Sequence, residues 1–128
     1  MTTIEAPGLK ASRQIAGLSH LSDGWRNGEG VAFDADYLAW LSESFSSMYP
    51  AHAPAPTVCP TTYGIISVEW SLADAEISLE IDPETRRGEL VWADPRTQHS
   101  GEVLLDMAKS EGWTRLANYL AKVAGASE

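Results

Sequence analysis

Three segments in the second half of the chain alternate between apolar and polar residues, and this pattern constrains the fold more than any other feature. The segments are GIISVEW (64–70), EISLEI (76–81) and GELVWA (88–93). Successive side chains of a β-strand point to opposite faces, so the first segment places Ile66, Val68 and Trp70 together on one face. Because the alternation recurs in all three segments, with turn residues between them, it predicts antiparallel strands with one buried face.

The length of the first loop between these strands sets their register. A four-residue loop (71–74) keeps the apolar faces of the two strands together. That loop pairs Val68 with Ile77 and Glu69 with Glu76, because register follows from the apolar pattern and the turn length. The sequence therefore predicts a hairpin in which two glutamates lie directly opposite each other.

Two flanking segments extend the predicted sheet. Residues 50–60 contain four prolines, which favour an extended connector or an edge strand. Residues 102–106 suit a short fourth strand beside the three alternating segments. The sheet is therefore expected to have between three and five strands.

Three further segments carry apolar residues at helical spacing. They cover residues 9–21, 35–48 and 110–125. Asp34 can cap the second helix and Ser110 the third, since short polar side chains accept the unpaired N–H groups at a helix start. With 128 residues, the chain fits one domain. The order α-α-β-β-β-(β)-α predicts a single α+β domain over residues 1–128, with helices packed on one face of an antiparallel sheet.

The charge of the chain is concentrated in its middle. The whole sequence carries a net charge of −9, whereas residues 23–85 alone hold eleven acids and one base, a net charge of −10. Such a field repels nucleic-acid backbones and attracts basic surfaces. We therefore expect a basic protein partner and no direct contact with nucleic acid.

The sequence also bears on the compartment. It contains no apolar run long enough for a membrane span, and MTTIEAPGLK lacks the features of a secretory signal. A lone cysteine, Cys59, forms no internal disulfide. These features predict a cytoplasmic protein without membrane contact.

Motifs that carry chemistry are missing from the sequence. The glycines at 24, 28 and 30 match neither a phosphate-binding loop nor a dinucleotide fingerprint, and no nucleophile elbow occurs. Cys59 has no basic neighbour in sequence to lower its pKa, so it reads as a small hydrophobic residue. The acidic residues between positions 23 and 36 do not follow the spacing of a calcium-binding loop. We expect no catalytic residues, no metal site and no cofactor.

Glu69, Glu76 and Glu80 form a different kind of cluster. Strand alternation turns all three to the polar side of the predicted sheet. Like charges on adjacent strands are mildly destabilising. The cluster fits either an ordinary solvated sheet face or a surface that a basic partner covers.

The five tryptophans divide between core and surface. Trp70 and Trp92 fit the apolar strand face, and Trp113 fits the apolar stripe of the last helix. Trp40 lies off the stripe of the second helix, so we expect Trp40 and Tyr37 to be exposed and Trp40 to anchor a partner.

Several motifs together resemble a family of small uncharacterised bacterial proteins. The motifs are GWRNGEG, YLAWLSESFSSMYP, PTTYGIISVEWSL and EISLEID, and the resemblance covers about residues 18–92. In this chain Tyr63 replaces the first glycine of a Gly-Gly pair, and Phe33-Asp34 stands where a proline commonly follows the glycine loop. The resemblance implies the α+β architecture and no established activity. We interpret the glycine loop as a structural clasp, with Trp25 folded back over the edge of the core.

These observations favour a non-enzymatic, acidic protein-binding module, either antitoxin-like or inhibitor-type, that recognises a basic protein. A phage anti-defence protein that imitates the charge of DNA is a variant of this hypothesis. The predicted binding residues are Glu69, Glu76 and Glu80, with Glu29 and Asp36 at the rim and Trp40 as the anchor. Two alternatives stay open: a small metal-dependent enzyme or ligand-binding protein that uses the acidic loop 23–36, and a structural subunit of a larger complex. A homo-oligomer is compatible with each.

Overall fold

Five antiparallel strands and three α-helices make up the fold in the computed structural model, which describes residues 6–51, 53–72, 74–95 and 98–125. The helices are α1 (Pro7–Gly17), α2 (Ala35–Met48) and α3 (Ser110–Gly125), with a short 3-10 helix, η1 (Leu18–His20), after α1. The strands are β1 (Thr57–Pro60), β2 (Ile66–Leu72), β3 (Ala75–Ile81), β4 (Arg87–Asp94) and β5 (His99–Asp106). The predicted α+β class and the order of its elements are confirmed.

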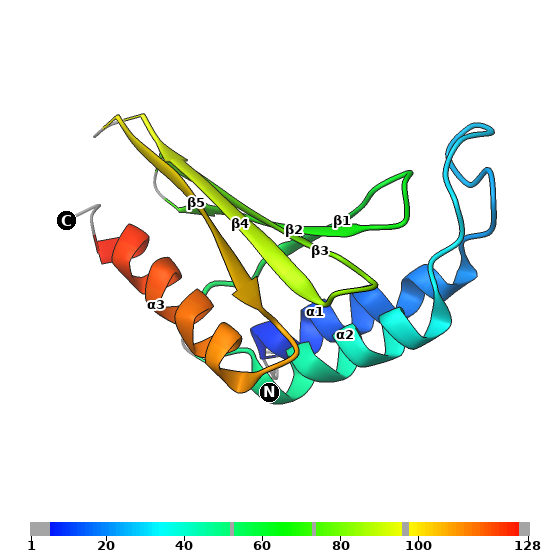
Figure 1. The fold of residues 1–128 in the computed structure, drawn as a ribbon, viewed down its shortest axis with the longest axis horizontal. Coiled ribbons are helices and arrows are strands. Elements are labelled where there is room, and N and C mark those ends of the chain that lie inside the picture. Colours follow the sequence, from blue (N-terminus) through cyan, green and yellow to red (C-terminus); the bar gives the residue numbers. More distant parts are fainter. Residues whose placement is uncertain (1–5, 52, 73, 96–97, 126–128) are drawn as a thin grey trace, which may run out of the picture.

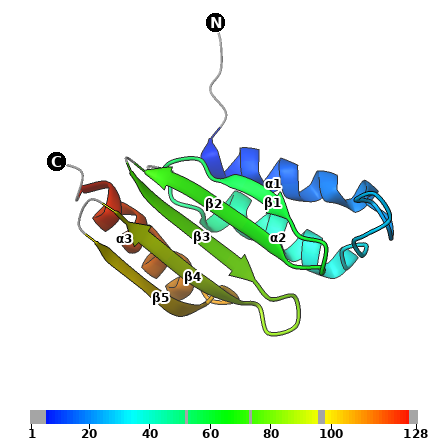
Figure 2. The same cartoon turned by 90° about the horizontal axis from the view of Figure 1, so that it is seen from above.

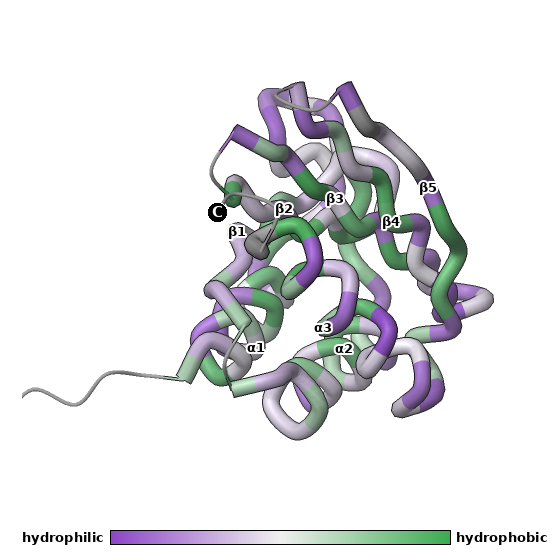
Figure 3. The backbone as a smooth tube through the Cα atoms, turned by 90° about the vertical axis from the view of Figure 1, so that its left-hand side faces the viewer, coloured by the Kyte–Doolittle hydropathy of each residue, from purple (hydrophilic) through white to green (hydrophobic). Residues whose placement is uncertain are grey.

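The strands form one sheet in chain order, β1-β2-β3-β4-β5, with every neighbouring pair antiparallel. Figure 1 shows the three helices together below this sheet, with nothing from the described part of the chain above it. The alternation of hydrophilic and hydrophobic residues can be followed along the strands in Figure 3. The sheet therefore has one covered face and one open face, as the alternation predicts.

The register of the first hairpin differs from the prediction. Val68 pairs with Leu79, and Leu72 pairs with Ala75, so two residues rather than four connect β2 and β3. One of these, Ala73, lies outside the described residues. Since the shift is two residues, every side chain keeps its face. The shift does separate Glu69 from Glu76, because Glu69 now lies opposite Ser78.

The helix boundaries follow local signals. Helix α2 begins as predicted, with the Asp34 carboxylate accepting a hydrogen bond from the Tyr37 N–H at 3.0 Å. The first predicted helix begins earlier, at Pro7, where proline is favoured in the first turn, and changes to a 3-10 turn at Leu18. In the described part of the chain, no helix combines the length and apolar composition needed to cross a bilayer.

The core lies between the covered sheet face and the helices. Its centre is completely buried and comes from β2, β3, β4, α2 and α3: Ile66, Val68, Leu79, Ile81, Leu90, Leu41, Phe45 and Leu116. Phe45 and Trp113 meet edge to face, with ring centroids 4.8 Å apart, and join α2 to α3. Burial of this apolar surface is the main driving force for the fold.

Two buried tyrosines tie the helical layer to the strands. Tyr37 is 1% exposed, and its hydroxyl donates to the Ile81 carbonyl at 2.5 Å and accepts from the Ile66 N–H at 3.0 Å. The predicted exposure of Tyr37 is therefore wrong, because its hydroxyl finds backbone partners inside the sheet. Tyr49 accepts a hydrogen bond from the Trp70 indole N–H at 2.9 Å and donates to the Pro54 carbonyl.

The glycine loop is a small hairpin closed by backbone hydrogen bonds between Arg26 and Glu29. Asn27 and Gly28 both have positive φ, as a type I′ turn requires. The Trp25 indole donates to the Val31 carbonyl at 3.1 Å and packs against the edge of the core. This arrangement agrees with the interpretation of the loop as a clasp.

Candidate protein-binding face

The sheet face turned away from the helices, called the outer face below, holds the candidate site. It faces the viewer in Figure 2, and none of the described elements covers it. Strand alternation and the register assign its residues. They are Thr57 and Cys59 on β1, Ser67, Glu69 and Ser71 on β2, Glu76, Ser78 and Glu80 on β3, Arg87, Glu89, Val91 and Ala93 on β4, and Ser100, Glu102, Leu104 and Asp106 on β5.

The three predicted glutamates, Glu69, Glu76 and Glu80, all lie exposed on the outer face. Glu89 and Glu102, also exposed, extend the acidic surface onto β4 and β5. Among the described strand residues of this face, Arg87 is the one base, and it lies at the end of β4 opposite Asp106. The outer face is therefore strongly negative.

The observed register reduces the repulsion between these acids. Glu69, Glu76 and Glu80 each lie opposite a serine across the β2–β3 ladder. Among the described pairs of the outer face, Glu80 and Glu89 form the one directly opposed pair of like charges. A directly opposed like-charged pair destabilises a sheet by a few tenths of a kcal/mol to about 1 kcal/mol. The face tolerates its charge because three of its five glutamates avoid that geometry.

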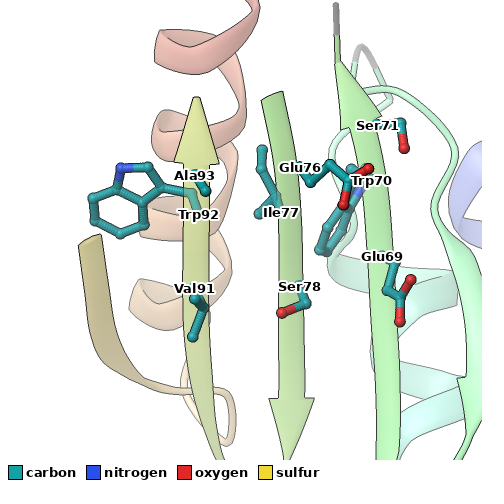
Figure 4. A pocket seen from close by; sticks show the side chains of 9 residues that line it. All are labelled: Glu69, Trp70, Ser71, Glu76, Ile77, Ser78, Val91, Trp92 and Ala93. Atoms are coloured by element: carbon teal, nitrogen blue, oxygen red, sulfur yellow. The ribbon is translucent and has the colours of Figure 1, made fainter. Parts of the chain in front are cut away.

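A shallow hollow of about 380 Å³ lies between the acids. Figure 4 shows Glu69 and Ser71 on β2 beside Glu76 and Ser78 on β3, with Val91 on β4. Carboxylates and hydroxyls accept hydrogen bonds from ammonium and guanidinium groups, and such charge-assisted bonds are the stronger ones. The hollow can therefore accept the end of a lysine or arginine side chain.

Apolar side chains interrupt the acidic surface. Val91 is 40% exposed and Leu104 is 60% exposed, and they occupy diagonal positions across the β4–β5 ladder. Their direct cross-strand partners are Glu102 and Glu89. Exposed apolar side chains among charged ones are typical of protein–protein contact surfaces, where they become buried on binding.

Tyr63, in the loop between β1 and β2, adds an aromatic ring at the end of the outer face. It is 60% exposed, and its hydroxyl donates to the Glu80 carboxylate at 3.0 Å. That hydrogen bond is the main reason why the pKa of Tyr63 is raised. Amphipathic rings of this kind are enriched among residues that dominate binding energies.

Cys59 lies on the outer face beside the glutamates. Partial burial raises the pKa of its thiol, and the nearby Glu69 carboxylate raises it further. A thiol is nucleophilic only as the thiolate, so Cys59 is a poor nucleophile at neutral pH.

The remaining predicted binding residues lie elsewhere. Glu29 lies in the glycine loop, and Asp36 lies in the first turn of α2. Trp40 is partly buried on α2, where its ring stacks on Tyr37 and the Arg86 guanidinium lies 4.7 Å from the ring centroid. The structure thus brings the three strand glutamates together and places Glu29, Asp36 and Trp40 outside the outer face.

Sequence reasoning missed four outer-face residues of the candidate site and one residue at its end. Alternation already places Glu89 and Val91 on the polar side of their strand. Glu102 and Leu104 could be assigned only from the pairing of β5 with β4. Tyr63 lies in a loop, where side chains follow no regular alternation.

The acidic loop offers little to a metal ion. Asp23 accepts a hydrogen bond from the Ala32 N–H at 2.8 Å, and Asp34 caps α2. Within the described ranges, no three or more histidine, cysteine or carboxylate side chains gather closely enough to hold a metal ion.

Comparison of the chain with protein-family models, with curated proteins and with solved structures finds no match. The interpretation of the site therefore depends on its geometry.

Proposed function

We propose that this protein is a non-enzymatic binding module that recognises a basic protein through the outer face of its sheet. The observation that carries this proposal is the set of five exposed glutamates around Val91 and Leu104 on a face that no described element covers. Such a surface is complementary to a partner that presents lysines and arginines around an apolar centre.

An inhibitor-type or antitoxin-like role suits this surface. Opposite charges accelerate the encounter of two proteins, and rapid capture is useful to a protein that must neutralise a basic target. Targets with a suitably positive surface include basic toxins and basic nucleic-acid-binding enzymes of defence systems.

The experiment that tests the proposal is capture of a partner from native lysate at low salt with three baits. The baits are the unmodified chain, the double variant Glu69→Lys/Glu80→Lys, and the matched control Glu43→Lys/Glu84→Lys. Glu43 and Glu84 are exposed on α2 and in the β3–β4 turn. Each pair of reversals changes the formal net charge from −9 to −5, so only position differs.

We expect the unmodified chain and the control to retain the same protein and the outer-face variant to lose it. Retention by all three baits would show that the outer face is not the binding surface. A stoichiometric partner that resists high salt would instead identify a structural subunit of a larger complex. Heat on titration with calcium or magnesium would favour the metal-dependent alternative, for which the loop residues give no support.

A further inference from the structure

The two edges of the sheet differ in their capacity to accept another strand. Strand β1 has four residues, whereas β5 has eight, and no described element lies beyond β5 in Figure 2. Sheet edges in proteins are commonly protected by proline, lysine or short strands. β5 contains neither proline nor lysine.

The hydrogen-bond pattern shows which backbone groups of β5 are free. The Met107 N–H donates to the Arg86 carbonyl at 3.1 Å, one step beyond the β4–β5 ladder. Bonded pairs recur at every second residue of an antiparallel ladder. The backbone N–H and C=O groups of Val103 and Leu105 therefore point to β4, whereas those of Glu102 and Leu104 point out from the free edge.

The same reasoning shows that the outer edge of β1 presents few N–H donors to a further strand. The Thr61 N–H donates to the Ile65 carbonyl at 3.1 Å, so positions 56, 58 and 60 are the ones directed away from β2. Two of these three positions are Pro56 and Pro60. Proline has no N–H to donate, so the β1 edge is a poor template for a further strand.

We infer that the β5 edge is where the partner docks, by adding an extended segment of basic sequence as a sixth strand. This inference rests on the proposed function. Main-chain hydrogen bonds from Glu102 and Leu104 would provide affinity, and the side chains of alternate residues would provide specificity. A residue opposite Glu102 lies on the outer face, where lysine or arginine pairs with that carboxylate. A residue opposite Leu104 on the same face is apolar.

The charge at this edge disfavours a second copy of the chain as the occupant. Two β5 strands that pair antiparallel about a twofold axis keep outer-face residues opposite outer-face residues. A register centred on Glu102 places Glu102 opposite Glu102, one centred on Leu104 places Glu102 opposite Asp106, and every register joins two chains of net charge −9. A basic segment gains from the same charge.

The test uses an acetylated nine-residue peptide that repeats Lys-Thr-Val-Thr, so that lysine and valine alternate along one face of the added strand, with a Glu-Thr-Val-Thr repeat as its matched control. Amide exchange is followed residue by residue by NMR on the full chain. We expect the lysine peptide to slow exchange at Glu102 and Leu104, whereas Val103 and Leu105 are protected already. The variant Leu104→Pro removes one outward N–H without removing a β4–β5 bond, and it should weaken binding about tenfold. Leu104→Thr keeps the N–H and should weaken binding by only about two- to threefold.

The possible results distinguish a failure of the edge inference from a failure of the proposed function. If the peptide shifts only the signals of Glu69, Glu76 and Glu80 and leaves exchange at Glu102 and Leu104 unchanged, the edge inference is overturned and the proposed function survives. Absence of peptide binding, or equal binding of the glutamate peptide, overturns the edge inference, while the capture experiment still decides the proposed function. Protection that rises with protein concentration in the absence of peptide would identify a second copy as the occupant and would also overturn it.

Discussion

Replacing Tyr37 with phenylalanine tests how the helical layer is fixed to the sheet. The hydroxyl of Tyr37 bridges Ile66 and Ile81, which are partners in the β2–β3 ladder. Phenylalanine keeps the ring but leaves the Ile66 N–H and the Ile81 carbonyl without this hydrogen-bond partner. A buried polar group that loses its partner costs about 1–3 kcal/mol. Because the two strands can partly close the gap, we expect a loss of about 2 kcal/mol in the free energy of unfolding, or about 6–8 °C in Tm.

Urea unfolding followed by tryptophan fluorescence measures this loss, and amide exchange at Ile66 localises it. Tyr63→Phe is the matched control, because it also removes a tyrosine hydroxyl that donates a hydrogen bond, but at an exposed position. The control should unfold at the same urea concentration as the unmodified chain. If Tyr37→Phe also unfolds there, the buried hydroxyl does not hold the two layers together and the reasoning is refuted.

Three further changes have defined outcomes. Glu89→Lys places a positive charge directly opposite Glu80. Tm should therefore rise by about 2 °C at low salt, and this gain should vanish at high salt. Gly30→Ala should cost about 2 kcal/mol in urea unfolding, because φ is +100° there and a Cβ would lie 2.6 Å from an indole nitrogen. Burial raises the pKa of Tyr37 and raises that of Tyr49 to about 12. Since the unfolded values are about 10, the contribution of these two tyrosines to the free energy of unfolding should be constant below pH 10, and urea titrations should show stability declining between pH 10 and 12.

The sequence predicts the faces of the strands better than their register. A period of two assigns each side chain to a face, but it cannot distinguish a two-residue loop from a four-residue loop, because both keep the faces aligned. That ambiguity accounts for the difference between the predicted partner of Val68, Ile77, and its partner in the structure, Leu79. The turn geometry decides between the two registers, and it is a property of the folded backbone.

Tyr37 shows a different limit. It lies four residues before Leu41 and eight before Phe45, on the same helical face, so the spacing contained the signal for its burial. A hydroxyl at such a position can be buried only if it finds hydrogen-bond partners there. Only the folded sheet reveals the two backbone groups that satisfy that hydroxyl. In the candidate site, likewise, Glu102 and Leu104 join the other residues only because β5 pairs with β4.

The residues that stabilise the fold and the residues that carry the negative charge lie on opposite sides of the sheet, so the proposed function can be tested without unfolding the protein. The buried core lies on the helical side of the sheet, while Glu69, Glu80 and Leu104 are exposed on the other side. Surface substitutions that leave the core intact usually change stability by no more than about 0.5 kcal/mol. Charge reversal on the outer face should therefore alter binding while the fold persists. Folding itself requires only polar residues there, and the acids add repulsion, which the positively charged partner of our proposal would offset.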